Sequence, residues 1–162
     1  MISAEGLSHA FTRNAAYLER HLDGLTHTNS LVQPPATGNC ILWILGHILC
    51  YRNFTLQALG DAPIMPEAAR FDAGSAPVTA DSPDLPRFEA LRAAFDQAQT
   101  RILEGIRRLT PEQAAEVITQ GSFTLPRAEL VMTYMRHESY HMGQFELLRE
   151  INVYDATTDA AP

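Results

Sequence analysis

Apolar residues recur every three or four positions along four long stretches of the chain, a spacing that places them on one face of an α-helix. These stretches predict helices over residues 3–23, 40–59, 87–109 and 126–152. A shorter helix is predicted to begin at 110–113, because Thr-Pro-Glu-Gln combines a capping box with proline in the first turn, and to fade near Gly121. No stretch carries a convincing strand pattern. The expected fold class is therefore all-α, a four-helix bundle with a short extra helix before the last long one.

The connection between the second and third predicted helices is long. Residues 60–86 contain five prolines and several small residues, which is typical of a loop. A crossover loop of this length is usually functional or mobile, so we expect either a lid over a pocket or a simple spacer. Asn39 is expected to cap the start of the second helix, predicted over residues 40–59. The whole chain, residues 1–162, is expected to form one domain with a core of about 5–152.

The charge balance narrows the range of partners. The chain carries 19 acidic and 12 basic residues, for a formal net charge of −7. Nucleic acids and anionic membranes recruit proteins through basic patches, so we expect neither as a partner. A chain of 162 residues is long enough to bury a core without disulfides.

The two cysteines and the N-terminus indicate a reducing compartment. Cys40 and Cys50 lie in one predicted helix, about 15 Å apart along its axis, whereas a disulfide needs Cα atoms within about 7 Å. The N-terminus lacks the basic start and apolar core of a signal peptide. The most apolar stretch, residues 40–51, is interrupted by His47 and is too short to span a bilayer. These features predict a cytoplasmic protein.

Histidines interrupt the apolar stripes of two predicted helices. On the last helix the stripe has apolar ends and a polar middle: Leu130, Tyr134, His137, His141, Gln144, Leu148 and Ile151. On the second helix one histidine interrupts the stripe formed by Cys40, Ile44, His47, Tyr51, Phe54 and Ala58. If these helices face each other, three imidazoles converge on one point, where the pair spaced i, i+4 can reach a single ion. Gly46 beside His47 leaves room for a neighbouring helix or a ligand.

A simpler interpretation exists for each histidine taken alone. A buried histidine is more often a hydrogen-bonded core residue than a metal ligand, and two histidines four residues apart on a helix are common by chance. Three imidazoles in an apolar seam without a cation, however, leave ring nitrogens that need partners. From the residues alone, both the metal site and the hydrogen-bonded core remain open.

Residues 137–141 also match H-E-x-x-H, the zinc-protease signature, in which the glutamate is the general base and a third ligand follows. The extended form of that motif fails here, because Gly143 comes one position early and no histidine follows His141. The later acidic residues lie off the stripe or in the tail. A protease is therefore disfavoured, and Glu138 is expected at the edge of the stripe, where it can orient a histidine.

Taken together, these motifs resemble the DinB-like (YfiT-like) metal-binding superfamily. The matching segments are N-C-I-L-W-I-L-G-H-I at 39–48, H-E-S-Y-H-M-G-Q at 137–144 and Leu-Arg at 148–149, and the similarity spans about residues 5–152. In that family, a histidine of the second helix and the H-x-x-x-H-x-G-Q segment bind a divalent metal inside a four-helix bundle. The resemblance implies that the metal ligands are His47, His137 and His141. It also implies a cytoplasmic homodimer.

The resemblance supports a site more firmly than a reaction. On family grounds we expect a thiol-dependent transferase that joins a low-molecular-weight thiol to a small electrophilic molecule. The alternatives are a hydrolase that uses a metal-bound water, or a non-catalytic, metal-stabilised stress-response or binding module. The expected cofactor is a divalent transition metal, with zinc and nickel as the leading candidates and iron and manganese as the others.

Other polar residues near these stripes are candidates for supporting roles. Gln144 and Tyr134 share the stripe of the last helix, where they can either hydrogen-bond a bound molecule or support the ligands. Asn14 and His21 lie on the inward stripe of the first helix, and His21 is expected to be peripheral. Two more histidines are expected on the surface: His9 and His27.

Overall fold

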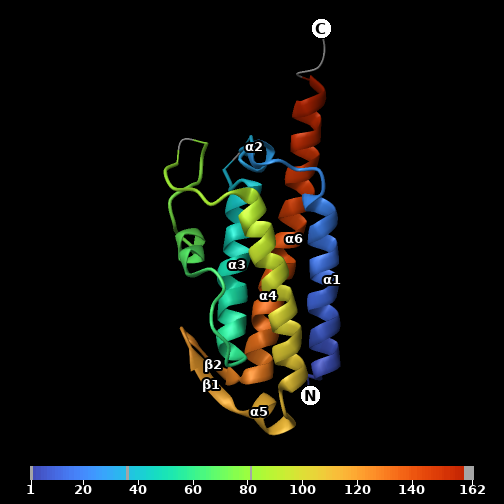
Figure 1. The fold of residues 1–162 in the computed structure, drawn as a ribbon, viewed down its shortest axis with the longest axis vertical. Coiled ribbons are helices and arrows are strands. Elements are labelled where there is room, and N and C mark those ends of the chain that lie inside the picture. The colour runs from blue at the N-terminus through green and yellow to red at the C-terminus, as the bar shows by residue number, and fades with distance from the viewer. Residues whose placement is uncertain (1, 36, 81, 159–162) are drawn as a thin grey trace.

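Within residues 2–35, 37–80 and 82–158, which the computed structural model describes, four long helices pack into a bundle (Figure 1). Side chains are described through residue 151. The helices are α1 (Ala4–Leu22), α3 (Ile41–Ala58), α4 (Phe88–Arg108) and α6 (Arg127–Thr158). Both α1 and α3 pack against α4 and α6, so α1 lies diagonally opposite α3. This arrangement confirms the predicted all-α fold class.

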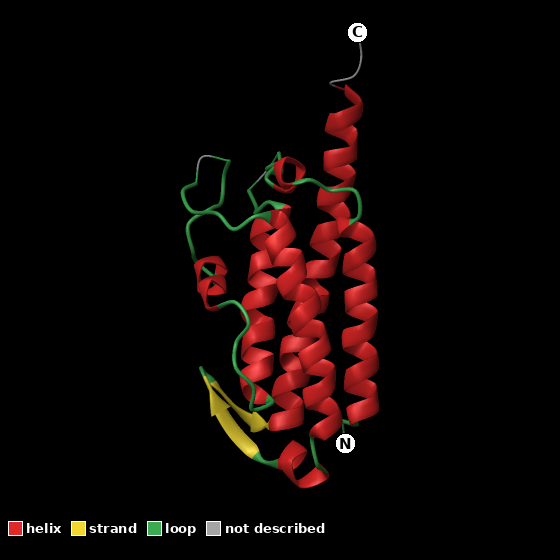
Figure 2. Ribbon diagram, viewed as in Figure 1, coloured by secondary structure: helices red, strands yellow, loops and turns green. Residues whose placement is uncertain are grey.

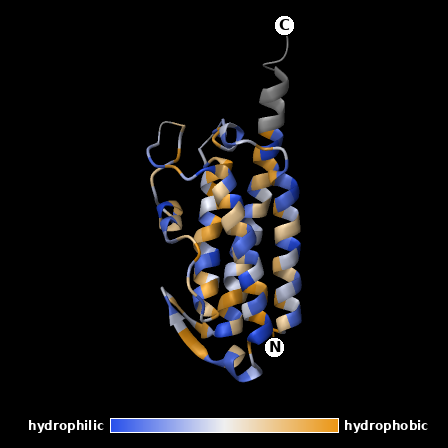
Figure 3. Cartoon of the chain, in the orientation of Figure 1, coloured by the Kyte–Doolittle hydropathy of each residue, from blue (hydrophilic) through white to orange (hydrophobic). Residues whose placement is uncertain are grey.

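Two of these helices, α1 and α4, each bury one stripe of apolar residues. Ser3 caps α1, where its hydroxyl accepts a hydrogen bond from the backbone N–H of Gly6 at 3.0 Å. The buried side chains of α1 are Leu7, Phe11, Leu18 and Leu22. Hydrophilic residues cover much of α1 in Figure 3, as expected of a helix that turns a single stripe to the core.

In contrast, α3 is buried on almost every side. Residues 41–50 are all buried, because α4 and α6 flank the helix and a short 3-10 helix, η1 (Pro66–Phe71), also packs against it. The residue that precedes α3 is Cys40, whose side chain makes no capping hydrogen bond. The predicted cap at Asn39 is therefore wrong by one residue.

The crossover between α3 and α4 is long, as predicted, and η1 lies within it. Three side chains of the crossover belong to the hydrophobic core: Ala68, Phe71 and Val78. The ring of Phe71 occupies the space over Gly46, where an added Cβ would lie 2.4 Å from ring carbons. Asn53 holds the start of the crossover by donating to the carbonyl of Met65 at 2.7 Å. This packing favours a fixed cover over α3 rather than a mobile lid.

A short helix and a β-hairpin connect α4 to α6 (Figure 2). The elements are α5 (Pro111–Ala115), β1 (Val117–Gln120) and β2 (Phe123–Pro126). The predicted capping box is present between Thr110 and Gln113. The strands pair antiparallel with Val117 opposite Pro126, and Gly121 adopts a φ of 58° in the turn, a conformation that favours glycine. The expectation that no strand forms is wrong for this segment, and α5 ends well before Gly121.

The last helix, α6, is longer than predicted, because it reaches Thr158 instead of Asn152. Its final turns extend past the other helices (Figure 1). At its start, Arg127 donates to the carbonyl of Ala58, which joins α6 to the end of α3. None of the helices in the described ranges has both the length and the apolarity of a membrane span.

The buried apolar side chains divide into two clusters along the bundle. The first includes Leu18, Leu49, Phe95 and Phe145, and the second includes Phe11, Leu56, Ile102 and Tyr134. Along each long helix, polar residues lie between the two clusters. They include Asn14, Arg52, Gln99 and Glu138.

Candidate metal centre

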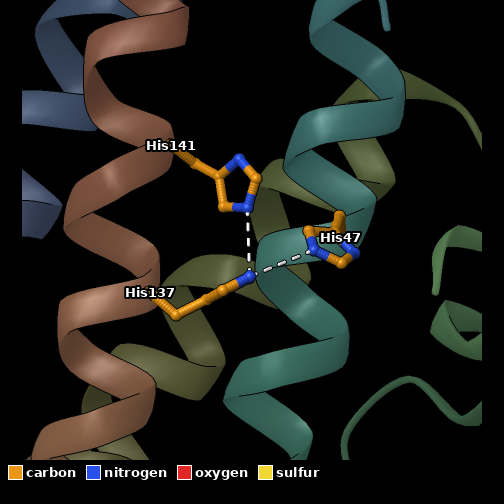
Figure 4. Close-up of side chains that lie close together, drawn as sticks. All are labelled: His47, His137 and His141. Atoms are coloured by element: carbon orange, nitrogen blue, oxygen red, sulfur yellow. Dashed lines mark hydrogen bonds between the residues drawn. The ribbon is translucent and has the colours of Figure 1, made fainter. Parts of the chain in front are cut away.

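Three histidine side chains from α3 and α6 point toward one another (Figure 4). The Nε2 atom of His137 lies 3.4 Å from Nε2 of His47 and 3.2 Å from Nε2 of His141. His47 and His141 are buried, and His137 is half-buried. The structure therefore brings together the three histidines that the sequence pattern singled out.

Each imidazole packs against an aromatic ring, which comes from the same helix for His47 and His141 and from α3 for His137. The ring pairs are Trp43 with His47 (4.8 Å between centroids), Tyr51 with His137 (3.6 Å), and Tyr140 with His141 (5.2 Å). The first two pairs are stacked and the third is edge-to-face. These contacts restrict rotation of the imidazoles and keep their surroundings weakly polar.

Hydrogen bonds at Nδ1 fix the tautomers of two histidines. The Nδ1–H of His47 donates to the carbonyl of Phe71 at 2.6 Å, and the Nδ1–H of His141 donates to Oε1 of Gln144 at 2.6 Å. A carbonyl oxygen only accepts, so in the neutral rings both Nε2 atoms carry lone pairs directed at the cluster. Nitrogen lone pairs this close together need a shared proton or a cation between them. The donor set therefore fits a transition-metal ion.

Burial keeps the three imidazoles neutral. It is the main cause that lowers the pKa of His137, to about 4, with further lowering from His141 and His47. Burial also lowers the pKa of His47, against the opposing effect of the Phe71 carbonyl. The pKa of His141 is lowered for the same reason, against the hydrogen bond to Gln144. Because neutral imidazole is the form that binds metals, the cluster is in its metal-binding form at pH 7.

Only three side chains of the ligand type join this cluster among the described residues. A site with three protein ligands keeps a coordination position open, which distinguishes catalytic zinc sites from closed structural ones. The cluster also lies near the surface, since Gln144 is half-buried and Tyr140 is 69% exposed.

Comparison with known proteins places this geometry in a family. Residues 10–145 match the DinB superfamily over most of the chain, including all three histidines. The chain belongs to the DinB superfamily. A conserved protein from Enterococcus faecalis of known crystal structure is 16% identical, and the alignment covers 94% of this chain and 98% of that one with a TM-score of 0.72. At this identity the likeness shows the fold alone. No curated protein matches the chain.

In this DinB-superfamily chain the glutamate of H-E-x-x-H does not face the histidines. Arg52 donates from Nε to Oε2 of Glu138 at 2.8 Å and from Nη2 to Oε1 at 2.9 Å. Glu138 was expected to orient a histidine, but both of its oxygens accept from Arg52, and it is 2% exposed. A carboxylate held in this way is not placed to act as the general base of a zinc protease.

The two other supporting candidates differ in their relation to the cluster. Gln144 contacts it directly through His141. Tyr134 is buried, and its ring packs at 5.9 Å against Tyr51, which in turn stacks on His137.

The polar residues of α1 lie outside the cluster. Asn14 donates to the hydroxyl of Ser139 at 3.0 Å and so joins α1 to α6. His21 packs against Tyr17 with centroids 4.3 Å apart, a peripheral position as expected.

The remaining histidines have other surroundings. His9 is exposed, as expected. His27 is half-buried instead, and its Nδ1 accepts a hydrogen bond from the N–H of Phe88 at 3.2 Å. The expectation of a surface position is therefore wrong for His27, which caps the first turn of α4.

Two features next to the cluster had been missed from the sequence. The Phe71 carbonyl that holds His47 is a backbone group and carries no sequence signal. Arg52 did carry one, because it is the only Asp, Glu, Lys or Arg within Ile41–Ala58. A lone charge inside an apolar helix predicts a buried partner.

Proposed function

We propose that this chain is an enzyme whose three histidines, His47, His137 and His141, hold one divalent transition metal. The observation that carries the proposal is the convergence of three Nε2 atoms, two of which have their Nδ1 atoms committed to oxygen acceptors. Zinc and nickel suit an all-imidazole site, and so does iron. Manganese fits less well because it prefers oxygen ligands.

The proposed reaction transfers a low-molecular-weight thiol to a small electrophilic molecule. When bound, the ion supplies a Lewis acid with an open position that lowers the pKa of an incoming thiol. The thiol loses its proton to solvent, its sulfur forms a bond to an electrophilic carbon, and the leaving group departs with the electron pair of the bond that breaks. A reducing compartment such as the cytoplasm supplies such thiols, and we place the reaction there.

The cysteines of the chain are not suited to the role of nucleophile. Cys40 and Cys50 are both buried and unpaired. Burial, with a smaller effect of Asp72, raises the pKa of Cys50 to about 11, and burial also raises the pKa of Cys40. Thiolates are the reactive form, so thiol chemistry at this site requires an external thiol.

Two other functions would use the same ligands. A hydrolase would use the open coordination position to activate water. A non-catalytic binding or stress-response module would have a closed site and would unfold without its metal. The three-ligand set supports the transferase and the hydrolase over the non-catalytic module.

The transferase proposal is tested with protein loaded with one equivalent of zinc or nickel. The loaded protein is incubated with glutathione, bacillithiol or mycothiol and a panel of electrophiles, and loss of free thiol is followed. We expect acceleration that disappears with a chelator and in His141→Ala. The His9→Ala variant, altered at an exposed histidine outside the cluster, should retain it. Metal-dependent ester or amide hydrolysis without any thiol reaction would assign the site to a hydrolase instead.

We also propose that two copies associate through the outer face of α6. Tyr140 and Leu147 are 69% and 63% exposed on that face. Between them, a Cβ added at Gly143 would meet nothing within 4 Å, so a second helix can approach closely. Antiparallel pairing about Gly143 would place Arg136 of one copy opposite Glu150 of the other. Light scattering should show a dimer for the wild type and a monomer for Leu147→Glu; a wild-type monomer would contradict this.

A further inference from the structure

A buried ion pair joins α3 to α6 beside the histidine cluster. The two-point contact between Arg52 and Glu138 involves side chains that are 1% and 2% exposed. The remaining nitrogen of Arg52, Nη1, donates to the carbonyl of Phe95 at 3.3 Å, and the guanidinium carbon lies 3.5 Å from the centroid of the Phe95 ring. The pair therefore connects α3, α6 and α4 at one point in the bundle.

Stability alone is a weak explanation for this pair. The loss of hydration offsets most of the attraction between buried charges, and apolar side chains of similar size often give an equally stable or more stable protein. The pair also interrupts the core, because it lies between the two apolar clusters. Apolar residues at these two positions would join the clusters into one.

The place of the pair relative to the histidines suggests a different role. Glu138 lies between His137 and His141 in the sequence, and Arg52 lies five residues after His47. A two-point contact fixes both the height of α6 along α3 and its rotation, whereas apolar packing is not directional. Metal–imidazole bonds tolerate errors of only about 0.2 Å, while one residue of slip along a helix amounts to about 1.5 Å.

We propose that Arg52 and Glu138 are positioning residues that set the register of α6 on α3, and that this register holds His47 within bonding distance of an ion shared with His137 and His141. The inference rests on the proposed metal-binding function. Neither residue joins the ligand cluster. Both act through the helices that carry the ligands.

The decisive variant replaces both charges by apolar side chains, Arg52→Met with Glu138→Met. Its metal affinity is measured by competition with a chromophoric chelator, and the stability of the metal-free protein by urea unfolding. We expect a urea midpoint equal to or above that of the wild type. The dissociation constant for zinc should nevertheless rise at least about tenfold, the lower end of the range for groups that support ligands.

A matched control removes a charge pair that lies away from the contact between α3 and α6. Arg101 pairs with Asp61 between α4 and the crossover, and both side chains are 27% exposed. The double variant Asp61→Asn with Arg101→Met should bind zinc within about twofold of the wild type, because it does not alter the contact between α3 and α6.

Each outcome decides the matter. A folded Arg52→Met, Glu138→Met protein that binds zinc within about twofold of the wild type overturns the inference. If that protein does not fold, Arg52→Lys decides, because it keeps the charge and loses the two-point contact. Affinity weakened about fivefold or more supports the inference, and unchanged affinity overturns it. A wild-type protein that binds no metal overturns the proposed function together with this inference, whereas wild-type binding with unaffected variants overturns the inference alone.

Discussion

The ring of Tyr51 lies flat against the imidazole of His137, with centroids 3.6 Å apart and an interplanar angle of 16°. His137 is also the histidine of the cluster whose Nδ1 has no hydrogen-bond partner in the part of the chain that the structure describes. His47 and His141 are held instead by oxygen acceptors. For His137, the stacked ring of Tyr51 therefore takes the place of a hydrogen bond in orienting the imidazole.

This relationship predicts that the ring of Tyr51, rather than its hydroxyl, supports metal binding. Tyr51→Ala should weaken zinc affinity about tenfold, by analogy with other groups that orient ligands. Tyr51→Phe keeps the stack and should bind as the wild type does. Chelator competition on both variants measures the difference. Equal losses in the two variants would show that the hydroxyl matters and the stack does not.

Gln144 is predicted to orient His141 by accepting from its Nδ1–H. Gln144→Leu has no acceptor and should weaken zinc affinity about 10- to 100-fold. Gln144→Glu places a carboxylate oxygen where the amide oxygen of Gln144 lies, so it keeps an acceptor and its affinity should stay close to that of the wild type. The affinities are compared by isothermal titration calorimetry. Wild-type affinity in Gln144→Leu would contradict this role.

Gly46 is predicted to be required because the Phe71 ring lies against it. Gly46→Ala should lower the free energy of unfolding by about 1–3 kcal/mol, the usual effect of overpacking. The same displacement should disturb the bond from His47 to the Phe71 carbonyl and weaken metal binding. Gly143→Ala, made in the Leu147→Glu variant that is expected to be monomeric and compared with that variant, is the matched control, because its added methyl meets open space within one copy. It should raise stability by up to about 1 kcal/mol through helix propensity. Urea unfolding of both variants measures whether the free energy of unfolding falls in Gly46→Ala and rises in Gly143→Ala.

The metal-free protein is expected to lose stability as the pH falls below 6.5. The pKa of His137 is lowered from its ordinary value of 6.5 to about 4, and those of His47 and His141 are also lowered, in each case chiefly by burial. Between these values the unfolded chain takes up protons that the folded cluster does not. The free energy of unfolding therefore decreases as the pH falls from 6.5 toward these lowered pKa values.

Urea midpoints of the metal-free protein at about pH 7.5, 6 and 5 measure this effect. In His137→Asn the urea midpoint should fall less steeply with decreasing pH, because this variant lacks the histidine with the most strongly lowered pKa. His9→Asn, altered at an exposed histidine, should follow the wild type. A wild-type midpoint that does not fall between about pH 6.5 and 5 would contradict the neutral state of the cluster.

Helical periodicity predicted the four long helices because each presents enough turns for a pattern to show. Thus α1 and α4 were predicted within about two residues at either end, since each buries one stripe. The hairpin was missed because each of its strands has four residues, which is too short for alternation to be distinguished from chance. The end of α6 was missed because the apolar stripe that predicted the helix ends at Ile151 in the sequence, whereas the helix continues to Thr158.

The candidate site was predictable where one helix alone carried the signal. His137 and His141 share a stripe at i, i+4 spacing, and His47 interrupts another apolar seam. Contacts between distant segments were not predictable in this way. The pairing of Arg52 with Glu138 spans 86 residues, and the periodicity of one helix does not show which side chain of another it meets. The partner that both oxygens of Glu138 accept from was therefore not predictable from the sequence.

The most direct test of the central claim is an anomalous-difference map from crystals of the protein grown with zinc or nickel. The account predicts one peak per chain, about 2.0–2.1 Å from Nε2 of each of the three histidines, His47, His137 and His141. A map with no peak among these imidazoles, or with the ion bound elsewhere on the chain, would contradict it.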